Sequence, residues 1–478
     1  MNDTIDDKQF RHVRLQSENG LMHIILPRNT CSTLVPGEYI WSHVLQGYIE
    51  QGFACMSDRL ANNMLNQLLH RDSSIDSIKL RTMSDLVERE GTGFLDSIVT
   101  WGEKTLEEHG WDPETGLPGK EAILAPGISA MDSNAYGSNL STDEERKQEV
   151  QTEEMIAALN MNRSEEFKIP DDPRLRDGVL SSKNVVSVSL DGVCTKRQKD
   201  TRPAKTSTGT SDEPFYTQDA LDGPENLKRV PDPKKRPKVE TAVAHIEADG
   251  RHYTLTAMNM FLLCKLVLAF LLSHNLLRGR DLLFLTDGGK DIKGAVETVF
   301  AFCPYTVILD WFHLRKHCQE LLSMSIIGGK ANFEIQYEIK RNLFRRLFYG
   351  NVDSAIKYLD FLPKNHVKNT KQLQALKDYL DRKRNYITCY VLRWKSKLRI
   401  SSNAVEKAND MLVSKRQKGN GMSWSRNGSW ALGGITMKYL NHESKNWNEN
   451  HFPAFNMHSK YGTLFCANDD VAGSEKVA

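Results

Sequence analysis

The sequence predicts a mixed α/β fold in which a central sheet is followed by a long helical segment. Short apolar runs rich in β-branched residues recur between residues 184 and 310, including a hairpin that turns at Asp249-Gly250, and helical patterns separate the later runs. Residues 314–399 are helical in pattern almost throughout. Three strands first, and then strands that alternate with helices, is an order typical of a mixed sheet.

The composition is that of an ordinary globular protein and excludes several special classes. A chain of 478 residues can bury a large core, and its hydrophobic content of 40% and charged content of 26% are ordinary for a globular protein. The net charge is only +2, so any nucleic-acid surface must be local. The eight cysteines form no CxxC pair, which argues against a zinc ribbon or a disulfide framework and fits a reducing, cytosolic setting.

The longest apolar run, residues 259–271, predicts a buried helix. Lys265 interrupts the run, which is also shorter than the ~20 residues that a membrane span needs. The N-terminus is polar and has no secretory signal pattern. We therefore expect no membrane contact and a cytoplasmic location.

The N-terminal region, residues 1–110, combines short strands up to about residue 40 with helical patterns after it. Gly91 and Gly93 separate two amphipathic stretches and predict a tight turn between two helices. Such a pair is compatible with a DNA-binding helix-turn-helix and equally with a plain helical hairpin.

Three other stretches have the composition of linkers, loops or tails. Residues 111–183 are rich in Gly, Pro, Ser and acidic residues and predict a linker with one helical island. Residues 195–239 predict a disordered polar loop, whose basic run 231–239 is more typical of a loop that touches DNA than of a nuclear-localisation signal. Residues 441–478 predict a loose tail.

Acidic residues follow two of the predicted strands. The run 184–193 ends in Asp191-Gly192, and the run 281–289 contains Asp287-Gly288-Gly289. Adjacent strands would bring the two carboxylates together, which is costly unless cations compensate. With a third acid, Glu406 in a predicted helix, they would form a site for two Mg²⁺ ions ~4 Å apart, suited to phosphoryl transfer. An Asp-Gly pair after a strand is also common in ordinary turns. Neither aspartate by itself therefore indicates a metal site.

The order and spacing of these acids resemble those of a known family. The motifs VSLDGV, FLTDGG, ILDWFHL and NAVEKAND, the last followed by KRQKGNGMSWSRNGSW, are similar to those of the DDE transposases of bacterial insertion sequences of the Kra and Lre types, which are related to the Mutator-like group. The resemblance covers residues 55–455. It implies an RNase H-like domain with a mixed five-stranded sheet, residues 184–313 and 400–440, interrupted by an all-helical insertion, residues 314–399, and preceded by a helical DNA-binding region.

The resemblance also implies the chemistry and its partners. Asp191, Asp287 and Glu406 would be the catalytic acids and would hold two Mg²⁺ or Mn²⁺ ions. Water would attack a phosphodiester at the terminal inverted repeats of the element, and the freed 3′-OH would attack target DNA. A homo-oligomer assembled on DNA, at the nucleoid of the bacterial cytoplasm, is expected.

The run VILDWFHLRKH, residues 307–317, lies where the helical segment begins. In the family that the chain resembles, a Cys or Asp closely followed by His marks this position, here Asp310 and His313. One acid and one His supply only two of the four ligands of a zinc site, so zinc is disfavoured. We expect both residues to support the site without holding the catalytic ions, and Trp311 and Phe312 to pack the insertion onto the sheet.

Basic and aromatic clusters predict where DNA would bind. Lys and Arg contact phosphates, and aromatic rings stack on unpaired bases. The cluster after Glu406 is the strongest candidate, although solvated helix faces with buried aromatics are the alternative for each residue. The candidates are Lys415, Arg416, Lys418, Trp424 and Arg426, with Arg393, Trp394 and Lys395 from an earlier cluster.

Three functions stay open at this point. The first is an active metal-dependent transposase. The second is a catalytically silent or domesticated DNA-binding descendant of a transposase, and the third is an RNase H-like nuclease. DNA binding without Mg²⁺- or Mn²⁺-dependent cleavage would favour the second, and cleavage of DNA that lacks the element's ends would favour the third.

Overall fold

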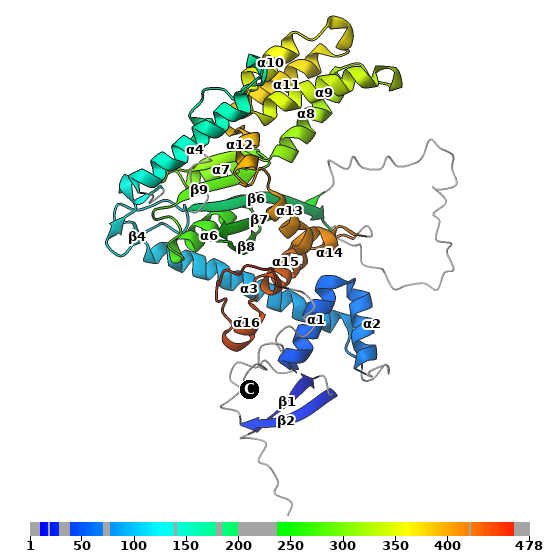
Figure 1. The fold of residues 1–478 in the computed structure, drawn as a ribbon. Coiled ribbons are helices and arrows are strands. Elements are labelled where there is room, and N and C mark those ends of the chain that lie inside the picture. The colour runs from blue at the N-terminus through cyan, green and yellow to red at the C-terminus, as the bar shows by residue number, and fades with distance from the viewer. Residues whose placement is uncertain are drawn as a thin grey trace, which may run out of the picture.

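A computed structural model describes residues 10–17, 20–27, 39–69, 77–137, 141–177, 184–198, 237–419 and 422–462. Within these ranges the chain is a mixed α/β protein with a five-stranded mixed sheet and many helices, which confirms the predicted α/β class. Figure 1 shows this sheet near the middle of the molecule, between helices. Most of the predicted disordered loop, residues 199–236, lies outside the described residues.

The central sheet has three antiparallel strands and two parallel ones. β6 (Val185–Lys196) pairs antiparallel with β7 (Lys238–Ala248), which pairs antiparallel with β8 (Arg251–Ala257). On its other side β6 pairs in parallel with β9 (Asp281–Thr286), and β9 pairs in parallel with β10 (Thr306–Leu309). The order across the sheet is therefore β8-β7-β6-β9-β10.

One face of the sheet packs against three helices. α6 (Met260–Ser273) is buried along most of its length, as its sequence predicts. α7 (Lys290–Val299) and the long α3 (Leu80–Glu108) lie beside it. No helix among the described residues is long and apolar enough to cross a bilayer. Side chains alternate between the faces of a strand, and those of β6 that point to this layer are Val186, Val188 and Leu190.

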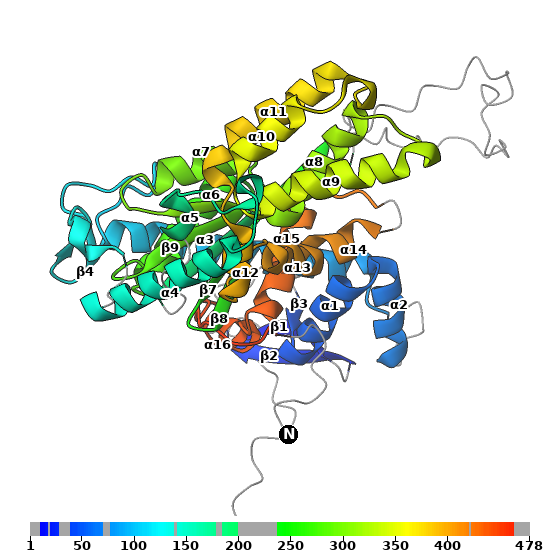
Figure 2. The same cartoon turned by 45° about the horizontal axis from the view of Figure 1, so that its top comes forward.

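The opposite face packs against the predicted helical insertion. α8 (Trp311–Ser325) begins directly after β10, and Leu283 and Leu285 of β9 share a core with its buried residues. The helices α8 to α11 pack against one another as a group that rises from the sheet in Figures 1 and 2. The other four helices of the insertion are α9 (Phe333–Phe348), α10 (Val352–Asp360), α11 (Thr370–Lys383) and α12 (Tyr390–Lys395).

The N-terminal region begins with strands and continues with helices, as predicted. A separate sheet has the strand order β2-β1-β3. Helices α1 and α2 follow it and share a core with α3. The bounds are β1 (Phe10–Ser17), β2 (Gly20–Pro27), β3 (Tyr39–Trp41), α1 (His43–Cys55) and α2 (Asp58–Leu68).

The predicted turn at Gly91 and Gly93 is wrong, because α3 continues through both glycines. The helix α15 (Arg426–Leu440) crosses α3 at this point. A Cβ atom on Gly91 would stand 2.1 Å from the carbonyl oxygen of Ala431. One on Gly434 would stand 2.7 Å from the carbonyl oxygen of Gly91. The glycine therefore serves a close helix contact, and residues 80–108 do not form two helices of a helix-turn-helix.

Residues 111–183 contain more packed structure than their linker-like composition predicts. Trp111 and Leu124 are buried in the main core. α4 (Thr142–Asn160) begins with a capping box between Ser141 and Glu144. Its Ile156 shares a small core with residues of α12. The segment therefore covers part of the sheet and the insertion, so only its composition is that of a linker.

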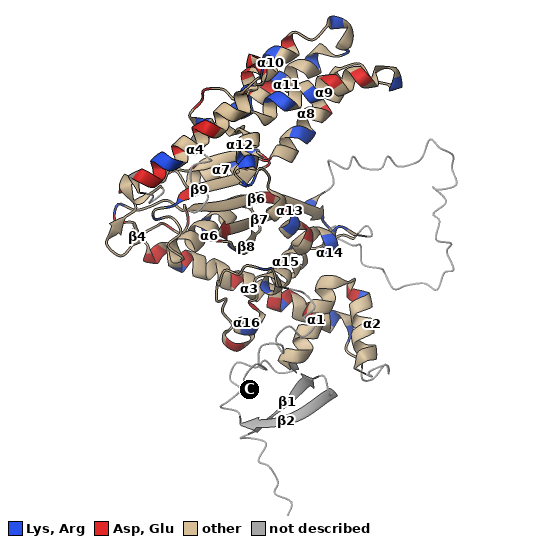
Figure 3. Ribbon diagram, viewed as in Figure 1, with Lys and Arg blue, Asp and Glu red and all other residues tan. Residues whose placement is uncertain are grey.

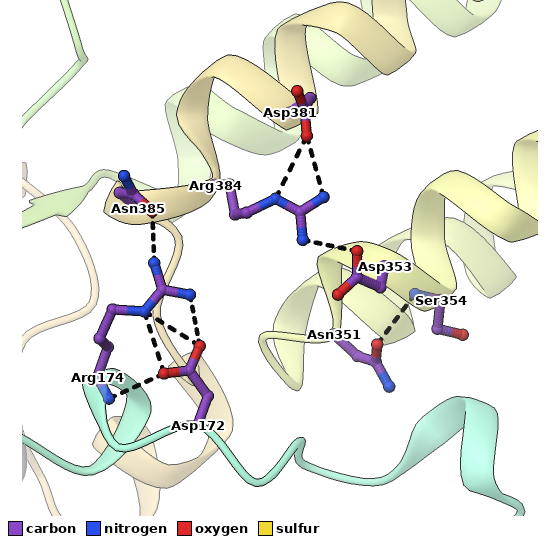
Figure 4. A network of polar contacts seen from close by, with 8 residues as sticks. All are labelled: Asp172, Arg174, Asn351, Asp353, Ser354, Asp381, Arg384 and Asn385. Atoms are coloured by element: carbon purple, nitrogen blue, oxygen red, sulfur yellow. Dashed lines mark hydrogen bonds and ion pairs between the residues drawn. The ribbon is translucent and has the colours of Figure 1, made fainter.

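A network of charged side chains ties the end of this segment to the insertion (Figure 4). Arg384, just after α11, pairs with Asp353 of α10 at 2.6 Å and with Asp381 of α11 at 3.0 Å. The next residue, Asn385, accepts a hydrogen bond from the guanidinium of Arg174. These contacts fix the turn after α11 relative to the chain that leads into β6.

The described part of the predicted tail packs against the sheet layers. α16 (Ser444–Asn450) follows α15, and the buried Phe455 stacks on Trp101 of α3 with 3.7 Å between ring centroids. Buried Glu443 accepts hydrogen bonds from the Tyr253 hydroxyl and from the amide of Phe455, at 3.0 and 2.8 Å. The prediction of a loose tail is therefore wrong for residues 441–462, while residues 463–478 lie outside the described part of the chain.

Candidate active site

Two acidic residues lie at matching positions, Asp191 on β6 and Asp287 directly after the end of β9. Their parallel pairing ends with Leu190 opposite Thr286, so Asp191 and Asp287 are the next residues along the two strands. Neighbouring strands lie ~4.8 Å apart, and matching register puts both side chains on the same face of the sheet. By alternation, this is the face of Leu285, on which the insertion packs.

Asp191 differs from its prediction in one respect. It does not end its strand, because β6 continues to Lys196 in antiparallel pairing with β7. Only the pairing with β9 stops before Asp191. The Asp191 backbone is therefore still paired with β7, and this pairing restricts its motion more than a turn would.

Burial and neighbouring groups set the charge of Asp191. Burial raises the pKa of Asp191 to about 6, and the negative charge of Asp287 acts in the same direction. The Gly192 amide donates to Oδ1 at 2.7 Å and the Asn409 side chain donates to Oδ2 at 2.6 Å, and both hydrogen bonds lower the pKa. His313 also lowers it by its charge. Two carboxylates that repel each other in a partly buried place provide a reason to bind a cation.

A helix brings the third predicted acid, Glu406, to the same place. α13 (Asn403–Asn409) continues through a π-helical segment (Asp410–Ser414) into α14 (Lys415–Gln417), and it packs on β6 and β7. Glu406 and Asn409 lie three residues apart on one face of α13. Since Asn409 bonds to Asp191, this face is turned toward β6.

His313 connects Glu406 with the aspartates. Its Nε2 lies 3.5 Å from Oε1 of Glu406, and both side chains are partly exposed, 31% and 42%. The same imidazole is close enough to Asp191 to affect the pKa of that carboxyl. The structure therefore places His313 beside Glu406 and within electrostatic reach of Asp191, while Asp287 neighbours Asp191 on the next strand, all at the edge between sheet and insertion.

Asp310 supports this arrangement from inside the protein. The side chain is fully buried, and its Oδ1 accepts a hydrogen bond from the His313 amide at 2.7 Å, which caps α8. Its Oδ2 accepts from the hydroxyl of Ser402 at 2.9 Å and from the amide of the same residue. Ser402 precedes α13 directly. One carboxylate thus fixes the starts of both helices that carry His313 and Glu406.

The two aromatic residues next to Asp310 behave differently from each other. Trp311 is buried in the core of the insertion, with its ring centroid 5.0 Å from that of Tyr390. Phe312 is 47% exposed. The predicted packing of the insertion onto the sheet is therefore right for Trp311 and wrong for Phe312.

The donor atoms suit a divalent cation with a preference for oxygen. Among the described residues, Asp310, His313 and Glu406 are the group whose possible ligand atoms all lie within 4.8 Å of one another. Asp310 is a poor ligand, because its side chain is fully buried and is committed to the starts of α8 and α13. Asp191, Asp287 and Glu406 are spread more widely than that group, and their carboxylates, which are at least partly exposed, are the kind of oxygen donor that Mg²⁺ or Mn²⁺ would need.

The insertion adds a lysine beside Asp287. Lys383, at the end of α11, donates from Nζ to the carbonyl oxygen of Gly288. Burial lowers the pKa of Lys383, whereas the charge of Asp287 raises it. Gly288 has a φ of 81°, and a Cβ atom there would stand 3.0 Å from Lys383 Nζ, so this turn requires glycine.

The predicted DNA-binding cluster after Glu406 contains both buried and exposed residues. Arg416 is 5% exposed, donates to the carbonyl oxygen of Phe53 and pairs with Asp58 at 2.5 Å. Its guanidinium lies 4.9 Å from the ring of Trp424. Both therefore join α14 to the N-terminal helices. The exposed members are Lys415, Lys418 and Arg426.

The earlier cluster divides in the same way. Arg393 is buried, its Nε donates to the carbonyl oxygen of Arg399 at 2.9 Å, and burial lowers its pKa to about 10. Trp394 is 58% exposed, and the Nζ of Lys395 lies 5.3 Å from its ring. Figure 3 shows basic residues on α13, α14 and the insertion, and the exposed ones are the candidates for phosphate contacts.

Asn409, Ser402 and Lys383 contact the site or its supports but were not among the predicted site residues. The spacing of Asn409 from Glu406 on one helix could have indicated it. Lys383 contacts a residue 95 positions away in the chain, and no local pattern indicates such a contact.

No known protein family matches the chain, and no curated protein is similar to it in sequence. The function of the site is therefore a proposal, which rests on its geometry and on the resemblance of its sequence motifs.

Proposed function

We propose that the protein is a DDE-type transposase of the bacterial insertion-sequence kind, acting at the nucleoid. It would cleave DNA at the terminal inverted repeats of its element and join the freed 3′ ends to target DNA. The observation that carries the proposal is the matched position of Asp191 on β6 and Asp287 directly after β9, with the helix of Glu406 bonded to Asp191 through Asn409.

The arrangement of the sheet supports an RNase H-like catalytic domain. In the family that the sequence resembles, the first catalytic Asp belongs to the first strand of this domain and the second to the end of the fourth. Here Asp191 lies on β6 and Asp287 directly follows β9, which are the first and fourth strands of the central sheet in chain order. The helical insertion between Asp287 and Glu406 agrees with the family that the sequence resembles.

The residues of the chain would act by holding and orienting groups. Two Mg²⁺ or Mn²⁺ ions would activate the attacking oxygen and stabilise the leaving one when bound. Asp191, Asp287 and Glu406 would hold them. Asn409 orients the Asp191 carboxylate, and the imidazole of His313 can donate to Glu406 and so fix its direction. The exposed lysines and arginine near α14 would neutralise DNA phosphates.

Replacement of the acids tests the proposal. Asp191→Asn, Asp287→Asn and Glu406→Gln keep the size of each side chain but remove its charge. We expect each to lower Mg²⁺-dependent cleavage and strand transfer by about a thousandfold or more, because residues that act as a unit fail together. The substrate is a plasmid that carries the DNA flanking the gene, and the products are measured on gels.

The matched control is Asp85→Asn, an exposed acid on α3, which should leave cleavage unchanged. Strand transfer that persists in the Asp191→Asn or Asp287→Asn variant would refute the proposal. A wild-type protein that binds DNA but does not cut it with either ion would be a silent descendant. One that cuts DNA without the element's ends would be a nuclease.

A further inference from the structure

A narrow apolar pocket opens beside Asp287, between α7 and the edge strand β10. Its cavity volume is about 50 Å³. One end is formed by Gly288 and Gly289, the two residues that follow Asp287. The walls are apolar side chains from β9, α7 and β10: Phe284, Ile292, Val296, Val307 and Leu309.

Aromatic rings and amines stand at the mouth of this pocket. Tyr305 and Tyr386 line it, and both are partly buried. Lys293 Nζ lies 5.6 Å and Lys383 Nζ 5.9 Å from the centroid of the Tyr386 ring. Lys293 also pairs with Glu297 at 3.5 Å, so Lys383 is the cation that faces Asp287.

The Tyr386 wall is held in place by its neighbours. Tyr386 ends the short turn that starts at Arg384, and the side chains of Arg384 and Asn385 are bonded to α10, α11 and Arg174 (Figure 4). A wall that is already fixed loses little freedom when a ligand binds. The pocket is thus formed before any ligand enters.

We propose that this pocket binds one unstacked nucleobase of the substrate DNA, next to the phosphodiester on which the acids act. The inference rests on the proposed function and adds a base-binding site to it. An apolar pocket lined by two tyrosines suits a base, and the lysines that also line it suit the adjoining phosphates. Because Gly288 and Gly289 form one end, the bound nucleotide lies beside Asp287.

The test measures coupling between the pocket and a single base. The full-length protein is titrated, in EDTA so that nothing is cleaved, with a fluorescein-labelled DNA strand of mixed sequence. Each base is replaced in turn by an abasic site, and affinity is followed by anisotropy. Val307→Trp fills the pocket from the edge strand, and Tyr386→Ala removes a wall. The matched control is Tyr337→Ala, an exposed tyrosine on α9.

We expect Val307→Trp and Tyr386→Ala each to weaken binding of the intact strand about tenfold, a loss in the range of one base–aromatic stack. An abasic site at one position should weaken binding to the wild type by a similar factor. The same abasic site should not weaken binding to the Val307→Trp variant any further. Tyr337→Ala should bind as the wild type does. Thermal unfolding of each variant checks that it is folded, and Tyr386→Ala gives a second reading if Val307→Trp is not.

Different failures have different meanings. If every abasic site reduces affinity by the same factor in the wild type and in both pocket variants, the pocket inference is wrong. Mg²⁺-dependent cleavage then still tests the proposed function independently. If free dAMP competes through the pocket but no abasic position matters, the ligand is a free nucleotide and not a base of DNA. A protein that binds no DNA at all would refute both.

Discussion

Single residues decide the geometry of the acidic site more than whole elements do. Asn409 donates to Asp191, and its own Oδ1 is buried with no partner in the described part of the chain. Asp310 has neither exposure nor a free carboxylate oxygen, yet it aligns two helices that meet at Glu406. The positions of the acids therefore depend on these two supporting side chains.

A histidine on β7 gives the protein an acid sensitivity that can be measured. Burial lowers the pKa of His245 to about 3, and the charges of His252 and Arg399 act in the same direction. The unfolded chain binds a proton near its ordinary pKa of 6.5, but the folded protein does not. The free energy of unfolding should therefore decrease as pH falls below 6.5 and continue to decrease toward pH 3.

His245→Gln tests this prediction, because glutamine can keep the polar contact with Tyr461 without binding a proton. Denaturant unfolding at pH 7.5 and pH 5 should show a smaller loss of stability in the variant than in the wild type. Equal losses would show that other groups, such as His252 and His458, account for the acid sensitivity.

At the scale of elements, the crossing of α3 and α15 joins the N-terminal helices to the C-terminal part of the chain. The contact is close because Gly91 and Gly434 carry no side chain. A buried pair, Glu50 of α1 with Lys438 of α15 at 2.6 Å, adds a polar contact to the same junction. α13, α14 and α15 follow one another, so this junction also supports the helix that carries Glu406.

Two glycines of α3 provide a matched test of the crossing. Gly91→Ala should destabilise the protein by ~1–3 kcal/mol or more, since the new methyl group overlaps the Ala431 backbone. Gly93→Ala meets its nearest neighbour, Trp447, at 3.8 Å and should stabilise the helix by up to ~1 kcal/mol. Denaturant unfolding measures both, and equal effects of the two substitutions would contradict the close crossing.

At the scale of the whole molecule, distant parts of the chain close over one another. Residues 451–462 return to the sheet after α16, where His252 and His458 exchange backbone hydrogen bonds at 2.8 and 3.1 Å. Phe455 fills the space between Trp101 and Tyr253, with ring centroids 3.7 and 5.9 Å away. The C-terminal segment is therefore part of the main core.

Two phenylalanines three positions apart test this closure. Phe455→Ala should lower the free energy of unfolding by ~3–5 kcal/mol, because it removes a buried ring from the core. Phe452→Ala, at a ring that is 44% exposed, should cost clearly less. Similar losses in thermal and denaturant unfolding would mean that the segment is not closed over the core in solution.

Local sequence patterns were sufficient for most elements of the fold. The hairpin at Asp249-Gly250 has the positive φ angles, 53° and 72°, that its turn residues indicate, and the apolar run of α6 is buried. The turn predicted at Gly91 was wrong, because a glycine that ends a helix and a glycine that allows another helix to approach closely cannot be distinguished in the sequence. The matched positions of Asp191 and Asp287 could be inferred, but contacts across the fold, such as those of Lys383, could not.

The position of the helical insertion in the chain has a consequence for protein synthesis. Asp191 and Asp287 leave the ribosome well before Glu406, which comes 406 − 287 = 119 residues after the second aspartate. At ~5–20 residues per second, that interval lasts roughly 6–24 s. Since Asp310 aligns α8 with α13, the three acids assemble only after the whole insertion has been made and folded. A nascent chain therefore carries an incomplete site until α13 has been made.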